Sequence, residues 1–344
     1  MLTVAFAGTF AASLAAPVRT HLGIPCDIRV IAEAGIVHEL GDVDVLVAMA
    51  FTREMAMAGR RLKLVQVPGA GLERIDRAAL PAGTALANAY GHEVGIAEYV
   101  LGAMLTLTRG FVRLDAALRR GVWESQWAAG APPPPPWPEL AGKTLGILGY
   151  GRIGQALAQR ARAFDMEICA IRRDVARSAR DGLARLVGLD ILDEVLRRSD
   201  YLAITLPATA ATRGLLGAAR LALMKPTAVL VNVARAEIVD EQALYRALAE
   251  RAIAAAALDV WYRYPTDATP TPPARQPFRR ARATHRGQHQ ADFARRAAGE
   301  PDRRVIRTRR RPARSRRRQR CHGRTARRSC DRAGPFEAAC GDTR

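Results

Sequence analysis

The sequence lacks the features of a membrane protein and of a disulfide-stabilised secreted protein. No apolar run reaches the roughly 18 residues that a membrane-spanning helix needs, and the apolar start MLTVAFAGTFAASLAAP lacks the positive segment of a secretory signal. Its five cysteines are odd in number and sparse, which fits a reducing compartment. Cys321, Cys330 and Cys340 lack the paired spacing of a zinc site. We therefore expect a cytoplasmic protein without a bound metal.

Acidic residues and lysine are scarce in the last part of the chain. The net charge is +20, but residues 275–344 contain 23 arginines, no lysine and six acidic residues, which leaves +3 for the first 274 residues. Residues 303–320 contain 11 arginines and no acid, as in a segment that binds phosphates. No aromatic residue interrupts this run, so bases have nothing to stack on. A polyanion-binding tail and a disordered, solvated tail both remain open, and binding to nucleic acid is the less favoured interpretation.

Most of the remaining chain has the pattern of two α/β domains, which its length and its 49% apolar content allow. Short apolar strands alternate with helical segments in the first part, which predicts a parallel sheet. An amphipathic run over Gly95–Arg120 predicts one long helix that connects the two domains. The prolines of Pro132–Pro136 predict an extended surface loop rather than a helix. The strands expected in the first domain are Val4–Ala7, Val45–Ala48, Leu64–Val67 and Ala85–Ala87.

The segment Lys143–Asp174 has the order strand, glycine-rich turn, helix, strand that binds a dinucleotide. Gly149 permits the tight turn, Gly151 lets the backbone approach a pyrophosphate, and Gly154 lets the helix pack on the strand. The helix that begins with Arg152 and Ile153 offers free N–H groups to the phosphates. The pattern predicts a nicotinamide-dinucleotide site.

Later strands in the second half end at polar or proline-marked turns. Such turns lie outside the carboxyl ends of a doubly wound sheet, where ligands bind. They predict further residues beside the nicotinamide: Leu206, Pro207, Thr212, Val233, Ala234, Arg235 and Asp259.

Six ordered motifs give the chain a close resemblance to one family. They are VPGAGLERID (67–76), NAYGHEVGIAEYVLGAML (88–105), LAGKTLGILGYGRIG (140–154), LPATAATRGLLG (206–217), LVNVARAEIVDEQAL (230–244) and AALDVW (256–261). Through these motifs the chain resembles the D-isomer-specific 2-hydroxyacid dehydrogenases, which include phosphoglycerate dehydrogenases and hydroxypyruvate or glyoxylate reductases. The resemblance covers residues 1–278.

The resemblance implies hydride transfer between a nicotinamide and C2 of a small 2-hydroxy or 2-keto acid such as glyoxylate or hydroxypyruvate. Arg235 matches the arginine that holds the substrate, and a guanidinium fork suits a carboxylate. The backbone of Gly69, Ala70 and Gly71 matches the loop that binds the substrate carboxylate. The family also implies a homodimer, with the Gly95–Arg120 helix and the loop after Trp123 at the interface.

The choice between the two coenzymes depends on the residues that follow the second strand of the dinucleotide segment. An acid that binds the ribose 2′-hydroxyl is expected about 20 residues after the glycine turn, and this chain has Arg172 and Arg173 there. Two guanidiniums would attract a 2′-phosphate, so NADP is favoured over NAD. Asp174 is the alternative ribose partner if the register shifts slightly.

The chain departs from the family at two places. Tyr264 stands where the family has the glutamate that holds the catalytic histidine protonated. After Phe278 the family continues into a strand with Thr-Pro-His and a long helix, whereas this chain becomes arginine-rich and loses its apolar periodicity. We interpret this change as a frameshift in a GC-rich gene, which would make His285 and His289 accidental and the activity low. A catalytically silent nucleotide sensor is therefore an alternative function.

The fold expected from these patterns is α/β, with two Rossmann-like, doubly wound parallel-sheet domains. Residues 1–95 form a flavodoxin-like substrate domain, residues 96–278 form the NAD(P)-binding domain, and residues 279–344 form an arginine-rich tail that is frameshifted or disordered.

Overall fold

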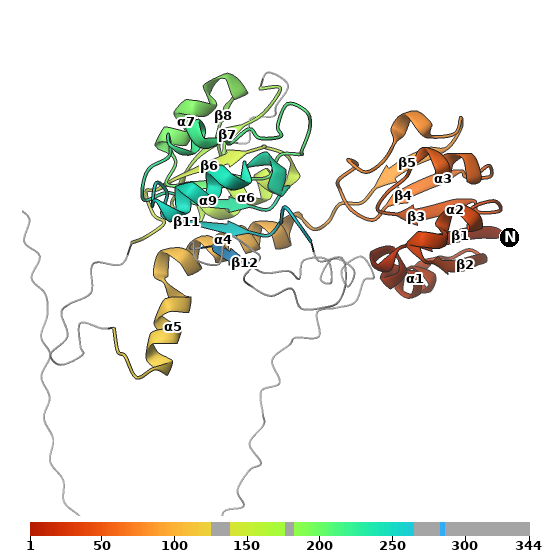
Figure 1. Ribbon diagram of the computed structural model, residues 1–344, viewed down its shortest axis with the longest axis horizontal. Helices are drawn as coiled ribbons and strands as arrows, with labels where there is room; N and C mark the ends of the chain where they lie inside the picture. The colour runs from red at the N-terminus through yellow and green to blue at the C-terminus, as the bar shows by residue number, and fades with distance from the viewer. Residues whose placement is uncertain (125–137, 176–181, 265–282, 286–344) are drawn as a thin grey trace, which may run out of the picture. The chain divides into compact units, whose positions relative to one another are not determined.

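A computed structural model describes residues 1–124, 138–175, 182–264 and 283–285, the last three as a strand without side-chain detail (Figure 1). The Pro132–Pro136 loop, His289 and the arginine-rich segment lie outside these residues. In the described part, no helix is both long and apolar enough to cross a membrane.

A five-stranded parallel sheet forms the first domain (Figure 1). Its strand order, β2-β1-β3-β4-β5, is the flavodoxin-like order expected from the sequence. Its core includes Phe6, Leu46 and Val65, which are fully buried. The strands are β1 (Leu2–Ala7), β2 (Cys26–Ile31), β3 (Val45–Ala48), β4 (Leu64–Val67) and β5 (Ala85–Asn88), and the helices are α1 (Thr9–His21), η1 (Glu33–Gly35), α2 (Ile36–Glu39), α3 (Arg53–Ala58) and η2 (Arg77–Ala79).

A seven-stranded parallel sheet forms the second domain, in the order β12-β11-β10-β9-β6-β7-β8. The chain starts at β6, builds outward to β8, and then returns to the other side of β6 with β9. The point where the order reverses therefore lies between β6 and β9, where doubly wound sheets bind their ligands. The strands are β6 (Thr144–Leu148), β7 (Glu167–Ile171), β8 (Arg185–Val187), β9 (Tyr201–Ile204), β10 (Val229–Asn232), β11 (Ala255–Leu258) and β12 (Ala283–His285).

Helices cover both faces of this second sheet. One buried cluster joins Leu244 and Leu248 to Leu230 and Leu258, and the other joins Val100 and its neighbours on α4 to the opposite face. The Asp240 carboxylate caps α9 by accepting from the Ala243 amide at 2.7 Å. The helices are α4 (Glu93–Arg109), α5 (Phe111–Arg119), α6 (Arg152–Arg162), η3 (Leu189–Ile191), α7 (Leu192–Arg198), α8 (Ala218–Leu221), η4 (Ala236–Ile238) and α9 (Glu241–Ala249).

The prediction of one helix over Gly95–Arg120 was wrong. The structure ends α4 at Arg109, and Gly110 adopts a left-handed conformation with φ of 65° before α5 begins at Phe111. Glycine adopts this conformation without the steric cost that a Cβ would add. The apolar periodicity continues through both helices and therefore did not reveal the break.

The structure also contains β12 within the range that the sequence had assigned to the tail. Its residues pair in parallel with β11, and His285 is opposite Leu258 in the register. This short strand extends the second sheet by one position beyond the expected end of the domain.

Candidate active site

Packing requires two of the three glycines in the turn that follows β6, namely Gly149 and Gly154. Gly149 has φ of 110°, and a Cβ there would lie 2.7 Å from the Leu206 amide nitrogen and 2.8 Å from its Cα. A Cβ at Gly154 would overlap the Gly149 carbonyl oxygen. Any larger side chain at either position would therefore push α6 or the end of β9 away from the turn.

Gly151 differs because it faces open space. A Cβ at this position would meet no atom of the described chain within 4 Å, and the residue directly precedes α6. The first amides of α6 have no side-chain cap from Gly151, so they can donate to an anion. Packing within the described protein therefore does not require a glycine at position 151. A glycine there would allow a dinucleotide phosphate to approach the backbone closely.

The end of β9 is tied to the glycine turn. The Thr205 amide donates to the Leu148 carbonyl at 2.9 Å, and its hydroxyl donates to the Gly149 carbonyl at 2.7 Å. Leu206 is buried against the turn, whereas Pro207 is exposed. The Thr212 hydroxyl donates to the Pro207 carbonyl at 2.7 Å, so it closes the loop that follows β9.

The end of β10 is shaped by a buried asparagine. The Asn232 side chain donates to the Arg235 carbonyl at 2.9 Å and accepts from the Ala234 amide at 3.0 Å. These bonds fold Val233 and Ala234, both buried, into a turn that leaves Arg235 exposed. The Arg235 guanidinium donates to the Ala234 carbonyl at 2.7 Å through Nη1.

Asp259 follows β11, the next strand of the sheet, and its amide donates to the Asn232 carbonyl at 3.0 Å. Burial raises the pKa of its carboxyl group to about 7, because a buried environment disfavours the charged form. Around neutral pH this group is therefore present in both its neutral and its ionised form. A neutral carboxyl can donate a hydrogen bond as well as accept one.

The loop Gly69–Gly71 follows β4 and is held by the last residue of β5 and the residue after it. The Asn88 amide donates to the Ala70 carbonyl at 2.9 Å, and the Ala89 backbone donates to the Gly69 carbonyl at 3.0 Å. A Cβ at Gly71 would overlap the Arg235 guanidinium and the Glu73 carboxylate. The structure therefore brings Gly71 and Arg235 together, although they come from different sheets.

Arg172 and Arg173 directly follow β7, and the Arg172 amide donates to the Val187 carbonyl at 2.9 Å. Arg172 is half-buried, and Arg173 and Asp174 are exposed.

The first turn of α6 carries two further predicted coenzyme residues. The Arg152 guanidinium lies 4.2 Å from the centre of the Tyr90 ring, which is a cation–π contact. Ile153 is half-buried in the first turn of α6.

Tyr264, at the position of the expected glutamate, is 62% exposed. Its hydroxyl oxygen accepts from the Trp261 amide at 3.1 Å, so it holds the backbone turn after Asp259.

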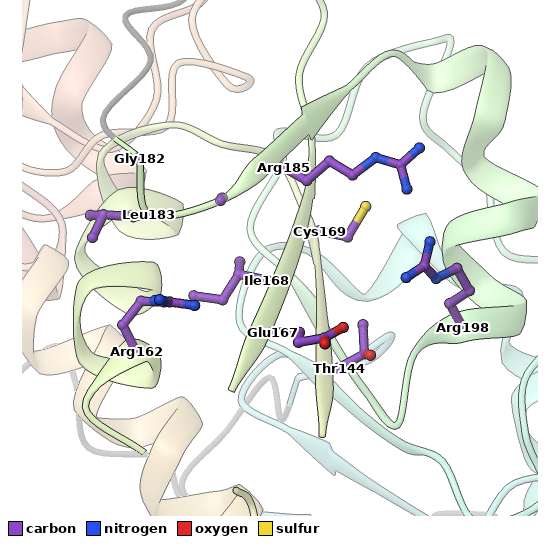
Figure 2. A pocket seen from close by; sticks show the side chains of 10 residues that line it. Thr144, Arg162, Glu167, Ile168, Cys169, Gly182, Leu183, Arg185 and Arg198 are labelled. Atoms are coloured by element: carbon purple, nitrogen blue, oxygen red, sulfur yellow. The ribbon is translucent and has the colours of Figure 1, made fainter. Parts of the chain in front are cut away.

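The cavity shown in Figure 2 lies at the opposite edge of the second sheet. It has a volume of about 330 Å³, and its lining includes Thr144, Glu167 and Arg185, which begin β6, β7 and β8. The glycine turn follows the other end of β6. The cavity is therefore separate from the edge at which the predicted site residues lie.

Sequence reasoning missed three residues that shape the site: Asn88, Thr205 and Asn232. Asn232 ends a buried strand, Thr205 directly follows another, and Asn88 ends the partly exposed β5. A polar side chain at such a point is a signal that could have been used. It also missed Glu73, whose carboxylate accepts from Arg235 Nη2 at 3.2 Å; nothing in the sequence links residues that are 162 positions apart.

The sequence of the chain matches known proteins of one family. The sequence profile described as "D-isomer specific 2-hydroxyacid dehydrogenase, NAD binding domain" matches residues 101–290. A D-3-phosphoglycerate dehydrogenase of Methanocaldococcus jannaschii is 36% identical over 68% of this chain, and the match spans 44% of that protein's length. A glyoxylate reductase of Pyrococcus furiosus is 36% identical over 69% of this chain and 71% of its own.

Solved structures with the same fold include a 2-hydroxyacid dehydrogenase from Ketogulonicigenium vulgare. It superposes with a TM-score of 0.69 at 26% identity and covers 87% of this chain and 93% of its own.

Proposed function

We propose, from the premise that this chain belongs to the D-isomer-specific 2-hydroxyacid dehydrogenase family, that it transfers a hydride between a nicotinamide coenzyme and C2 of a small 2-hydroxy or 2-keto acid. The observation that supports this most directly is the glycine turn. Gly149 and Gly154 are required by packing, while Gly151 faces open space at the start of α6. Of the three glycines, only Gly151 has no packing reason within the described part of the protein, and a bound coenzyme phosphate would explain its small size.

The residues that would hold the coenzyme lie along the carboxyl ends of β6, β7, β9, β10 and β11. The α6 amides would donate to the pyrophosphate, and the turns after β9, β10 and β11 would surround the nicotinamide. When bound, the nicotinamide supplies or accepts the hydride. The proposed coenzyme residues are Gly149, Gly151, Arg152, Ile153, Gly154, Leu206, Pro207, Thr212, Val233, Ala234 and Asp259.

Arg235 is proposed to bind and orient the acid. Its fork would hold the carboxylate or polarise the keto oxygen. The amides of Gly69, Ala70 and Gly71 would bind the carboxylate of the same substrate, since Gly71 lies against the Arg235 guanidinium. We propose a small keto acid such as glyoxylate or hydroxypyruvate as the substrate.

We propose NADP rather than NAD as the preferred coenzyme. Arg172 and Arg173 follow β7 at the position where an NAD-dependent enzyme has an acid, and Arg173 is exposed. Two guanidiniums there would bind a 2′-phosphate with charge-assisted hydrogen bonds. The measurement is the ratio of the dissociation constants of NADPH and NADH, which the double variant Arg172→Ala, Arg173→Ala should shift toward NADH.

A homodimer is proposed from the apolar surface of α5. Phe111 and Leu118 are 54% and 62% exposed, and Trp123, just beyond the helix, is 68% exposed. Large apolar side chains gathered at one surface indicate a protein interface. Sedimentation of the wild type and of a Phe111→Ser, Leu118→Ser variant tests this: the wild type should sediment as a dimer and the variant as a monomer.

The second candidate function is a catalytically silent nucleotide sensor. Tyr264 favours it, because the hydroxyl cannot supply the charge with which a carboxylate would hold a histidine protonated. The frameshift hypothesis has the same consequence; of the residues that it concerns, the structure describes only those of β12. Reading the gene in all three frames past codon 278 tests it; an alternative frame should encode Thr-Pro-His and an amphipathic helix.

Steady-state oxidation of NADPH with glyoxylate separates the two functions. Turnover that is lost in Arg235→Ala supports the dehydrogenase. Tight coenzyme binding without turnover supports the sensor.

A further inference from the structure

The Arg235 guanidinium, which the proposed function assigns to the substrate, is paired with a carboxylate of the protein itself. Its Nη2 donates to Glu73 Oε2 at 3.2 Å. Both groups lie against the α-carbon of Gly71, since a Cβ there would overlap Arg235 Nη2 and Glu73 Oε2. The Glu73 carboxylate is therefore next to the backbone loop at which the carboxylate of a 2-keto acid is proposed to bind.

We propose that Glu73 is an internal competitor for Arg235: it neutralises the guanidinium in the free enzyme, and the substrate carboxylate displaces it. The inference rests on the proposed function, because it assigns Arg235 to the substrate. Glu73 is thereby a residue that determines specificity, although it never touches the reacting carbon.

The ion pair has the properties of one that can exchange partners. The Arg235 side chain is 45% exposed and that of Glu73 is 25% exposed, so water can solvate Glu73 when it is released. Partly exposed pairs add little to stability. Arg235 also keeps its Nη1 bond to the Ala234 carbonyl, and the Asn232 side chain holds the backbone of the same turn. The guanidinium is therefore oriented by its own turn and does not need Glu73 for its position.

Glu73 also sets which acids are accepted. After displacement its charge remains beside the bound substrate, because the Glu73 backbone follows Gly71 by two residues in the same loop. A substrate with one negative charge exchanges one anion for another at Arg235. A substrate with a second anionic group would add a like charge next to Glu73, and like charges in contact discriminate against the wrong ligand. Glu73 therefore favours monoanionic keto acids over dicarboxylic or phosphorylated ones.

A purely structural role predicts a different result. If Glu73 served to position Arg235, its removal would weaken the binding of every anion. If it competes, its removal strengthens the binding of monoanions and strengthens that of dianions more. Glu73→Gln keeps the size and the hydrogen-bonding capacity of the side chain and removes the charge, whereas Glu73→Asp keeps the charge. Glu194→Gln is the matched control, because Glu194 also pairs with arginines, Arg185 and Arg198, but at the opposite edge of the second sheet.

The experiment measures the binding of oxamate, a monoanion, and oxalate, a dianion, to the full chain saturated with NADPH, by quenching of coenzyme fluorescence. Glu73→Gln should lower the dissociation constant of oxamate about two- to fivefold, as expected for a partly exposed ion pair, and that of oxalate by a larger factor. Glu73→Asp and Glu194→Gln should stay within twofold of the wild type.

The outcomes separate this inference from the proposed function. If NADPH does not bind to the wild type, the proposed function fails and the inference fails with it. If NADPH binds and Glu73→Gln binds both anions no better than the wild type, or more weakly, the inference is overturned while the proposed coenzyme site stands. If NADPH binds and neither anion binds to any variant, there is no anion to displace Glu73, and the inference is overturned as well.

Discussion

Two alanine substitutions in the same turn should have different effects: Gly149→Ala should lower stability, and Gly151→Ala should weaken coenzyme binding. Gly149 has a φ that L-residues rarely adopt, and its Cβ would approach the Leu206 backbone to 2.7 Å. The strained backbone costs about 1–3 kcal/mol, and the overlap costs about 1–3 kcal/mol more. Gly149→Ala should therefore destabilise the second domain by about 2–6 kcal/mol, which lowers its melting temperature by roughly 4–24 °C.

Gly151→Ala should leave stability unchanged, because the φ of Gly151 is −87° and its Cβ would enter open space. We expect a change within about 0.5 kcal/mol, as for a surface substitution. The added methyl group would instead occupy the space of the coenzyme phosphate. Loss of one charge-assisted hydrogen bond costs about 1.5–3 kcal/mol, so the dissociation constant of NADPH should rise roughly tenfold to hundredfold.

Thermal unfolding followed by circular dichroism measures the first quantity, and fluorescence titration with NADPH measures the second. NADPH binding by Gly151→Ala that is as tight as binding by the wild type would contradict the placement of the coenzyme phosphate at Gly151. A wild-type melting temperature of Gly149→Ala would contradict the packing role of Gly149, because the two glycines would then not have the separate roles that their surroundings indicate.

Three further predictions concern the strand ends. Asn232→Ala should lower the free energy of unfolding by about 1–3 kcal/mol, the cost of leaving a buried polar group unpaired. It should also weaken oxamate binding, because the turn that carries Arg235 loosens. An unchanged free energy of unfolding in denaturant and an unchanged dissociation constant of oxamate would contradict this. The pKa of Asp259 is raised from 3.8 to about 7, so the folded state binds more protons than the unfolded state between these values, and this group makes stability fall as pH rises from about 4 to 7. In Asp259→Asn that part of the pH dependence should disappear from urea midpoints measured across this range, and an identical profile for both proteins would count against it. Arg172→Ala alone should weaken NADPH binding more than NADH binding, which paired titrations check; an equal effect on both coenzymes would remove Arg172 from the 2′-phosphate.

The parallel sheets could be predicted because most of their central strands are short, mainly apolar runs. Val45–Ala48 and Leu64–Val67 were predicted with the bounds that the structure has. β2 was missed, because its charged Asp27 and Arg29 interrupt the apolar pattern. These residues are tolerated at the edge of the sheet, where Arg29 pairs with Asp27 and Asp42.

The site could be predicted as a set of strand ends but not as a set of contacts. The glycine spacing contains the information about the turn, because Gly149 and Gly154 each answer a local steric demand. The Asn232 bonds and the Arg235–Glu73 pair depend on how distant segments meet, which periodicity and spacing do not encode. The break at Gly110 was hidden for a related reason: a single left-handed residue does not disturb the apolar periodicity on either side.

The central claim is that a nicotinamide coenzyme binds along the carboxyl ends of the second sheet. Calorimetric titration of the purified chain with NADPH and with NADH tests it most directly. The account predicts saturable binding at one site per chain, tighter for NADPH, and strongly weakened in Gly151→Ala at unchanged stability. Absence of binding by both coenzymes to the folded wild-type protein would contradict it.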